Sequence, residues 1–93
     1  MFKVTVNYYN LISDCIGIKR EVIALEENST IQDLLDEIFA KHGEKISHIF
    51  MDENRQIFSH IKVLLNDTIV NYPFNEKLQD EDQIHFLIAL VGG

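Results

Sequence analysis

The sequence predicts an α+β fold in which a mixed sheet of four or five strands packs one face against a single main helix. Apolar residues alternate with polar residues near both ends of the chain, as they do in strands with one buried face. Between these segments, residues 31–39 repeat apolar side chains at helical spacing. Strands gathered around one helix form a two-layer α+β arrangement.

The first strand is predicted from four alternating apolar residues, Phe2, Val4, Val6 and Tyr8. Residues 9–17 break this pattern with turn-forming side chains, so they are expected to join the first strand to a second one in a hairpin. The second strand is predicted over residues 18–25. Within it we expect Ile23 and Leu25 to point inward and Glu21 to point outward.

The main helix is predicted to begin after Thr30, with Asp33 completing a capping box at its first turn. One apolar stripe follows, made of Ile31, Leu34, Leu35, Ile38 and Phe39. Gly43 is predicted to end this helix. A separate helical turn is expected over residues 46–50.

Three further strands are predicted in the C-terminal half, over residues 61–65, 68–70 and 84–88. Asn66-Asp67 is expected to form a tight turn, and Leu78 to anchor the loop that precedes the last strand. After a polar turn, Ile57 and Phe58 are expected to start another short strand. If the first strand lies centrally, the last strand can pair with it in parallel and carry the chain out at one corner of the sheet.

Composition limits the possible functions of the 93 residues, which are predicted to form one domain over 1–93. The formal net charge of −7 disfavours nucleic acid and anionic membranes as partners, and it is compatible with a basic protein partner. The start of the chain alternates, unlike a signal peptide, and no apolar run approaches the roughly 18 residues of a membrane span. A cytoplasmic protein is therefore expected.

Neither the single cysteine nor the histidines indicate a catalytic or metal site. Cys15 has no cysteine to pair with, so it can form no internal disulfide and no cysteine-based metal site. The four histidines are spread over different predicted elements, at His42, His48, His60 and His85. Because metal ligands must converge, we expect no metal site.

The final seven residues are the stretch most suggestive of function, because an apolar run passes directly into Gly92 and Gly93. Glycine is costly to order and has no evident structural use at this place. Two residues without side chains can, however, slide through a narrow slot and carry a carboxylate into another protein's active site. A frayed end without function is the alternative.

Five segments carry a family resemblance: residues 4–17, 30–35, 63–67 and 78–84, and the diglycine at 92–93. In this order they resemble the β-grasp sulfur carriers. These are ubiquitin-like proteins typified by the small subunit of molybdopterin synthase (MoaD-like) and the thiamine sulfur carrier (ThiS-like). The resemblance implies a β-grasp fold and is closest to the molybdopterin synthase subunit. Asp67 and Glu81 depart from the family pattern, which often has glycine at these places.

The resemblance also implies a chemistry. In this family an adenylating enzyme of the ubiquitin-activating type uses ATP and Mg²⁺ to activate the C-terminal carboxylate, and a persulfide then gives a thiocarboxylate. If this chemistry applies to the present sequence, Gly93 is the adenylated residue, and Gly92 lets the tail pass through the narrow entrance of the enzyme's active site. The protein is then a carrier rather than an enzyme, and it binds no cofactor itself.

Partner docking is expected at two places. An apolar patch beside the tail is expected from Leu87, Ala89, Leu90 and Val91, and an acidic segment that helps to recognise a basic partner from Asp80, Glu81 and Asp82. The expected partners are the adenylating enzyme and a larger synthase subunit or another sulfur acceptor. Three functions stay open: a sulfur carrier for molybdopterin, thiamine or another pathway, a modifier joined to lysines through Gly93, and an interaction module.

Overall fold

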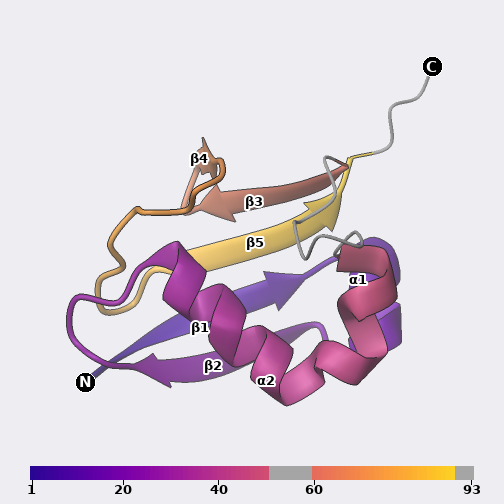
Figure 1. The fold of residues 1–93 in the computed structure, drawn as a ribbon, viewed down its shortest axis with the longest axis horizontal. Helices are drawn as coiled ribbons and strands as arrows, with labels where there is room; N and C mark the ends of the chain where they lie inside the picture. The colour runs from indigo at the N-terminus through magenta and orange to yellow at the C-terminus, as the bar shows by residue number, and fades with distance from the viewer. Residues whose placement is uncertain (51–59, 90–93) are drawn as a thin grey trace.

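Seven secondary-structure elements follow one another in the computed structural model, which describes residues 1–50 and 60–89 (Figure 1). They are, in chain order, β1 (Phe2–Tyr8), α1 (Asn10–Ile16), β2 (Arg20–Leu25), α2 (Ile31–Phe50), β3 (Ile61–Leu65), β4 (Thr68–Val70) and β5 (Gln83–Ile88). The strands form one five-stranded sheet, and α2 crosses one of its faces. The predicted α+β fold is confirmed.

The last strand, β5, occupies the centre of the sheet, whose order is β2-β1-β5-β3-β4. β1 and β5 run parallel, and the other three neighbouring pairs are antiparallel. The predicted parallel pairing of the first and last strands is therefore confirmed, although β1 lies one place from the centre. β5 is therefore held along both edges, by β1 on one side and by β3 on the other.

The core lies between α2 and the covered face of the sheet. Alternate residues of β1 are buried there, and Val6, Ile84 and Phe86 have no exposed surface. The other face carries exposed apolar side chains, since Val22 and Ile69 are 58% and 56% exposed. We call this second side of the sheet the open face.

The N-terminus of α2 is capped as predicted. The Thr30 backbone N–H donates to Asp33 Oδ2 at 2.9 Å, and the Asp33 N–H donates to Thr30 Oγ1 at 3.3 Å. Each residue thus satisfies a backbone donor that the helix leaves unpaired. The apolar stripe is also confirmed: four of its residues are buried and the fifth is half-buried, namely Ile31, Leu34, Leu35, Ile38 and Phe39.

The prediction that Gly43 ends the helix is wrong, because α2 continues through it to Phe50. Ile46 and Phe50 lie beyond the glycine and are completely buried. The Phe50 ring packs against Phe86 of β5 with ring centroids 5.5 Å apart. Burying two such side chains stabilises the last turns by several kcal/mol, whereas an interior glycine costs about 1 kcal/mol. Tertiary packing therefore outweighs the local preference.

The predicted hairpin of the first two strands is confirmed by their antiparallel pairing, but the connection between them contains a short helix, α1, instead of a turn alone. Ile12 and Ile16, four residues apart, bury one face of α1. Gly17 ends it in the left-handed conformation with φ of 90°, and its N–H donates to the Ser13 carbonyl at 2.8 Å. The second strand consequently begins at Arg20 instead of residue 18.

The elements of the C-terminal half agree with the prediction for β3, β4 and β5. Asn66 takes the positive φ of the tight turn, 55°, and Leu78 is only 4% exposed, as expected for an anchor. Glu81, where the resembled family often has glycine, has a φ of 68°. The strand predicted to start at Ile57 and Phe58 lies outside the described residues.

Candidate functional site at the C-terminal end of β5

The central strand, β5, leads directly into the C-terminal segment that is predicted to be functional. Tyr9 donates its N–H to the Phe86 carbonyl at 3.1 Å, and Ala89 donates to the His60 carbonyl at 2.8 Å. The end of β5 is thus tied on one side to the chain after β1 and on the other to the chain before β3. The base of the tail is held by the sheet up to residue 89.

Two of the residues predicted to dock a partner lie at this place. Leu87 and Ala89 are both half-buried, and Leu87 belongs to the open face. The other two apolar docking residues, Leu90 and Val91, lie outside the described residues. So do the predicted tail residues Gly92 and Gly93.

The predicted acidic segment lies at the opposite end of β5. Asp80 and Asp82 precede the strand, whose six residues span about 20 Å, so the segment is well separated from Leu87 and Ala89. Asp80 Oδ1 accepts the Lys3 backbone N–H at 3.0 Å. The two Asp82 oxygens accept bonds from the Asn66 amide at 3.2 Å and the Gln79 N–H at 2.8 Å. Asp80 and Asp82 therefore shape the entry into β5, and Glu81 between them is exposed.

A larger surface, of which only Leu87 was predicted, extends over the open face from the C-terminal end of β5 to β4. Leu64 of β3 pairs with His85 of β5 and with Ile69 of β4, and Lys62 pairs with Leu87. The Tyr9 hydroxyl lies 2.8 Å from His85 Nδ1. We call the six residues the tail-side patch: Tyr9, Lys62, Leu64, Ile69, His85 and Leu87. Five of the six lie in strands at alternating positions that face the same side of the sheet, and this alternation was visible in the sequence. The order of the strands, which brings them together, was not.

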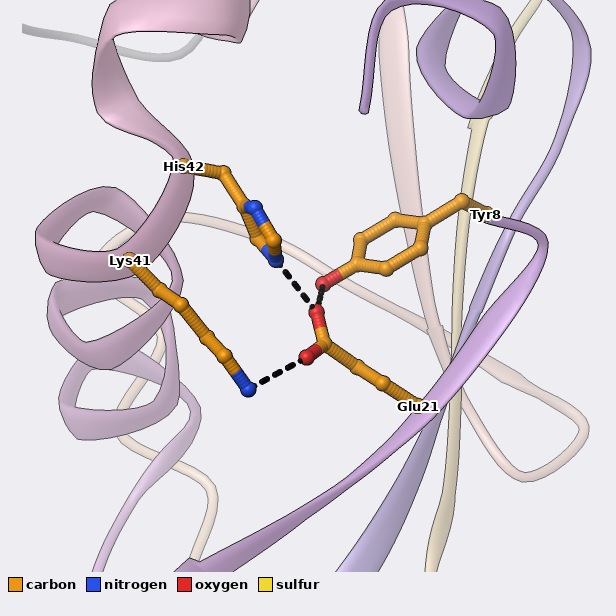
Figure 2. Close-up of polar contacts among 4 residues, drawn as sticks. All are labelled: Tyr8, Glu21, Lys41 and His42. Carbon is orange, nitrogen blue, oxygen red and sulfur yellow. Dashed lines mark hydrogen bonds and ion pairs between the residues drawn. The ribbon is translucent and has the colours of Figure 1, made fainter. Parts of the chain in front are cut away.

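A second cluster joins α2 to the first two strands around the carboxylate of Glu21 (Figure 2). Glu21 Oε2 accepts hydrogen bonds from the Tyr8 hydroxyl at 2.6 Å and from His42 Nε2 at 2.7 Å, and Oε1 pairs with Lys41 Nζ at 2.7 Å. Because an ionised carboxylate only accepts, His42 carries a proton on Nε2. The Glu21 side chain is 9% exposed.

The prediction that Glu21 points outward is therefore wrong. Glu21 is two residues before Ile23 and four before Leu25, and the side chains at such spacing in a strand share one face. Ile23 and Leu25 face the core as predicted, so Glu21 must lie beside α2. Lys41 and His42 provide the partners that make this burial possible.

The pKa values in this cluster move in opposite directions. Burial of the Glu21 carboxyl raises its pKa, but hydrogen bonds from Lys41, Tyr8 and His42 more than offset this, so the pKa lies below its usual range. Burial raises the pKa of Tyr8, and its hydrogen bond to the Glu21 carboxylate raises it further. The pair is thus an ionised carboxylate and a neutral phenol that stabilise each other.

The remaining titratable side chains form no metal site in the described ranges, where no three His, Cys, Asp or Glu residues are grouped to hold an ion. His42 and His85 have the partners given above, while Cys15 is a half-buried free thiol on α1. No helix in residues 1–50 and 60–89 is long and apolar enough to cross a membrane.

Comparison with solved structures places the fold in the ubiquitin-like β-grasp class. SAMP1 from Haloferax volcanii superposes with a TM-score of 0.85 at 18% identity, over 98% of this chain and 99% of that one. A Pyrococcus furiosus protein assigned provisionally as molybdopterin converting factor, subunit 1, gives 0.77 at 23% identity, over 97% and 100%. The Amycolatopsis orientalis BexX/CysO complex contains a chain that gives 0.70 at 20% identity, over 97% and 99%.

Sequence comparison identifies the family. The profile of the ThiS family matches residues 6–93, which is nearly the whole chain. No match was found among curated protein sequences. The protein belongs to the ThiS family, and the resemblance to β-grasp sulfur carriers is confirmed.

Proposed function

We propose that this protein is a sulfur carrier whose Gly93 carboxylate is adenylated and then converted to a thiocarboxylate, and that the sulfur is used to make molybdopterin. The observation that carries the proposal is the ThiS-family match, which extends through Gly92 and Gly93. The structure adds a firm base for such a tail, since β5 is the central strand. The similarity to a protein assigned as a molybdopterin converting factor subunit supports this pathway over the thiamine pathway.

The chemistry explains the division of work between the carrier and its partner. A carboxylate resists nucleophilic attack because its leaving group is poor. In the proposed reaction, the adenylating enzyme uses ATP and Mg²⁺ to join AMP to the carboxyl carbon of Gly93, releasing pyrophosphate. A persulfide sulfur then displaces AMP, and a thiol reduces the resulting acyl disulfide to leave the thiocarboxylate.

The role of this chain is to present its Gly93 carboxylate to the adenylating enzyme, and we therefore regard it as a substrate without catalytic residues of its own. Gly92 keeps the tail thin enough to enter a slot, and the pairing of Ala89 with His60 fixes where the tail departs. Because the reaction consumes ATP, the proposal places the protein in the cytoplasm. The larger partners are the adenylating enzyme and a synthase subunit that accepts the sulfur. The complex of BexX with CysO supports docking by such a fold.

A second function is favoured by one observation, the similarity to SAMP1, a small archaeal modifier protein. In that case the activated Gly93 would form an isopeptide bond with a lysine of another protein. Thiocarboxylate formation and conjugation both begin with adenylation, so adenylation alone does not separate them.

Mass spectrometry of the protein isolated from its own cells tests the proposal. Exchange of one oxygen for sulfur at Gly93 is expected for the carrier, and lysine adducts ending in Gly92-Gly93 are expected for the modifier. Deletion of Gly93 should abolish both products and the ATP-dependent adenylation. A full-length chain with neither product, in cells that make molybdopterin, would indicate an interaction module and would refute the proposal.

A further inference from the structure

Strand β2 forms a long border of the sheet. In the part of the chain that the structure describes, β1 is the only strand that pairs with β2 (Figure 1). β2 has six residues, whereas the strand at the other border, β4, has three. The outer edge of β2 therefore presents a row of backbone N–H and C=O groups to which a further strand can be added.

The pairing with β1 determines which residues of β2 point these groups outward. The Tyr8 N–H donates to the Lys19 carbonyl at 2.8 Å, so the backbone of Lys19 faces β1. Successive residues of a strand direct their N–H and C=O groups to opposite sides, and those of Arg20 therefore point away from β1. By the same alternation, Val22 and Ala24 also direct their backbone groups to the outer edge.

The charged residues along this edge are sorted by sign. Lys19 and Arg20 lie at the start of β2, where both are exposed and neither has a carboxylate partner among the described residues. Glu26 and Glu27 directly follow the last residue of the strand and are also exposed. The one carboxylate within β2 belongs to Glu21, which faces α2. The edge is thus cationic at its beginning and acidic at its end.

A second copy of β2, laid antiparallel along this edge, presents the same charges in the opposite order. When the two Val22 residues are opposite each other, Arg20 lies opposite Ala24 of the second copy and diagonally next to its Glu26, within reach of a long side chain. Both charged side chains are then on one face of the sheet, because their positions differ by an even number. The outward backbone groups match in the same register, which gives about six hydrogen bonds.

We infer that the protein forms a symmetric dimer through the outer edge of β2, and that two Arg20–Glu26 pairs select its direction and register. The two-fold axis passes between the Val22 side chains, each 58% exposed in the single chain, and every contact occurs twice. The central β5 strands of the two copies then run in opposite directions, so the two tails leave at opposite ends of the joined sheet. The inference does not depend on the proposed function.

The charges on the page favour a second copy over other arrangements. A parallel pairing would bring the two cationic ends together, and a strand from another protein would need the charge order that this chain itself supplies. Glu21 points inward, as charges that protect an edge often do, but Lys41 and His42 already pair with it. The net charge of −7 on each copy opposes association, yet charges beyond about 10 Å are screened at physiological ionic strength.

Sedimentation equilibrium and NMR spectra at increasing protein concentration test the inference. A dimer held by one pair of short strands should be weak, because it buries far less than the roughly 1,600 Å² of a stable complex. Concentrations up to about 1 mM are therefore needed. The average mass should rise toward twice that of the monomer, and the amide signals of Arg20, Val22 and Ala24 should shift with concentration.

Exchanging the charges gives a sharper test. Arg20→Glu alone and Glu26→Arg alone should each raise the Kd of the dimer about 10-fold, because each places like charges together twice. An equimolar mixture of the two variants should dimerise about as strongly as the wild type, since each offers the charge that the other lacks. Glu26 is chosen because Glu27 already contacts the N-terminal ammonium at 3.3 Å.

Lys62→Glu is the matched control. Lys62 lies on β3, three strands and about 14 Å from β2, so this reversal of charge should change the Kd less than about two-fold. A wild type that stays monomeric up to about 1 mM would overturn the inference. So would a mixture that dimerises no better than either variant alone, an equal effect of Lys62→Glu, or concentration-dependent shifts on β4 instead of β2. Unfolding curves confirm that each variant is folded.

Discussion

Replacing Glu21 with glutamine should destabilise the protein and remove one part of its acid sensitivity. The substitution keeps the size and planarity of the side chain but removes the charge that Tyr8, Lys41 and His42 all contact at 2.6 to 2.7 Å. It also replaces one of the two acceptor oxygens with an amide N–H₂, which meets either Lys41 or the donors of Tyr8 and His42. The free energy of unfolding should therefore fall without a cavity being created.

The magnitude follows from the three contacts. A hydrogen bond to a charged group contributes about 1.5–3 kcal/mol and a neutral one about 0.5–1.5 kcal/mol, so each enclosed contact loses about 1 kcal/mol. The Lys41 side chain is 56% exposed, and its ion pair counts for less than about 1 kcal/mol. Glu21→Gln should therefore cost about 2–3 kcal/mol at pH 7.

The pH dependence has a definite sign. The pKa of Glu21 is lower in the folded than in the unfolded protein, so the carboxylate stabilises the fold above its unfolded pKa of about 4.3. This contribution is lost as the pH falls through the folded pKa. The difference in stability between the wild type and Glu21→Gln should thus shrink between about pH 5 and pH 2.

Urea denaturation at several pH values measures this difference. Glu37→Gln is the control, because Glu37 is an exposed residue of the same α2 helix, and its change should stay within about 0.5 kcal/mol. A cost below about 0.5 kcal/mol for Glu21→Gln at pH 7, or a cost that is constant down to pH 2, would refute the reasoning.

Three further predictions concern the helices and the acidic segment. Gly43→Ala should stabilise the fold by about 0.5–1 kcal/mol in thermal unfolding, because the added Cβ meets open space. Gly17→Ala should destabilise the fold, because the φ at this position is +90°. A change in stability of the same sign for both variants would contradict this. Thr30→Ala should cost about 1 kcal/mol in the same assay through the lost cap, and no change would disprove the capping role. When Asp80, Glu81 and Asp82 are all replaced with asparagine, the protein should associate more slowly with a basic adenylating enzyme at low salt, as measured by stopped flow. An unchanged rate would remove that recognition role.

The sequence predicted the elements whose pattern depends on near neighbours. The Thr30 cap and the helical stripe after it were found because every signal lies within a few residues. The tight turn at Asn66 and the alternation of β5 were found for the same reason. Such features need no knowledge of which strands are neighbours.

The errors arose where distant residues decide the structure. The helix continues past Gly43 because Phe50 packs against Phe86 of β5. Glu21 is accommodated beside α2 because it contacts Lys41 and His42, which lie 20 and 21 residues further along the chain. The tail-side patch depends on the strand order, which brings β3 beside β5. The predicted roles of Gly92 and Gly93 were drawn from family resemblance, and they stay predictions.

The parallel pairing of β1 with β5 also determines how the protein resists a mechanical pull. The start of β1 and the end of β5 lie at opposite ends of this pair, so tension between the N-terminus and the tail slides the two strands past each other. In that shear geometry the hydrogen bonds along the pair share the load, whereas strands that peel apart break them one after another. A partner protein that pulls on the tail would therefore meet strong mechanical resistance, and the folded domain should stay intact while its tail is bound.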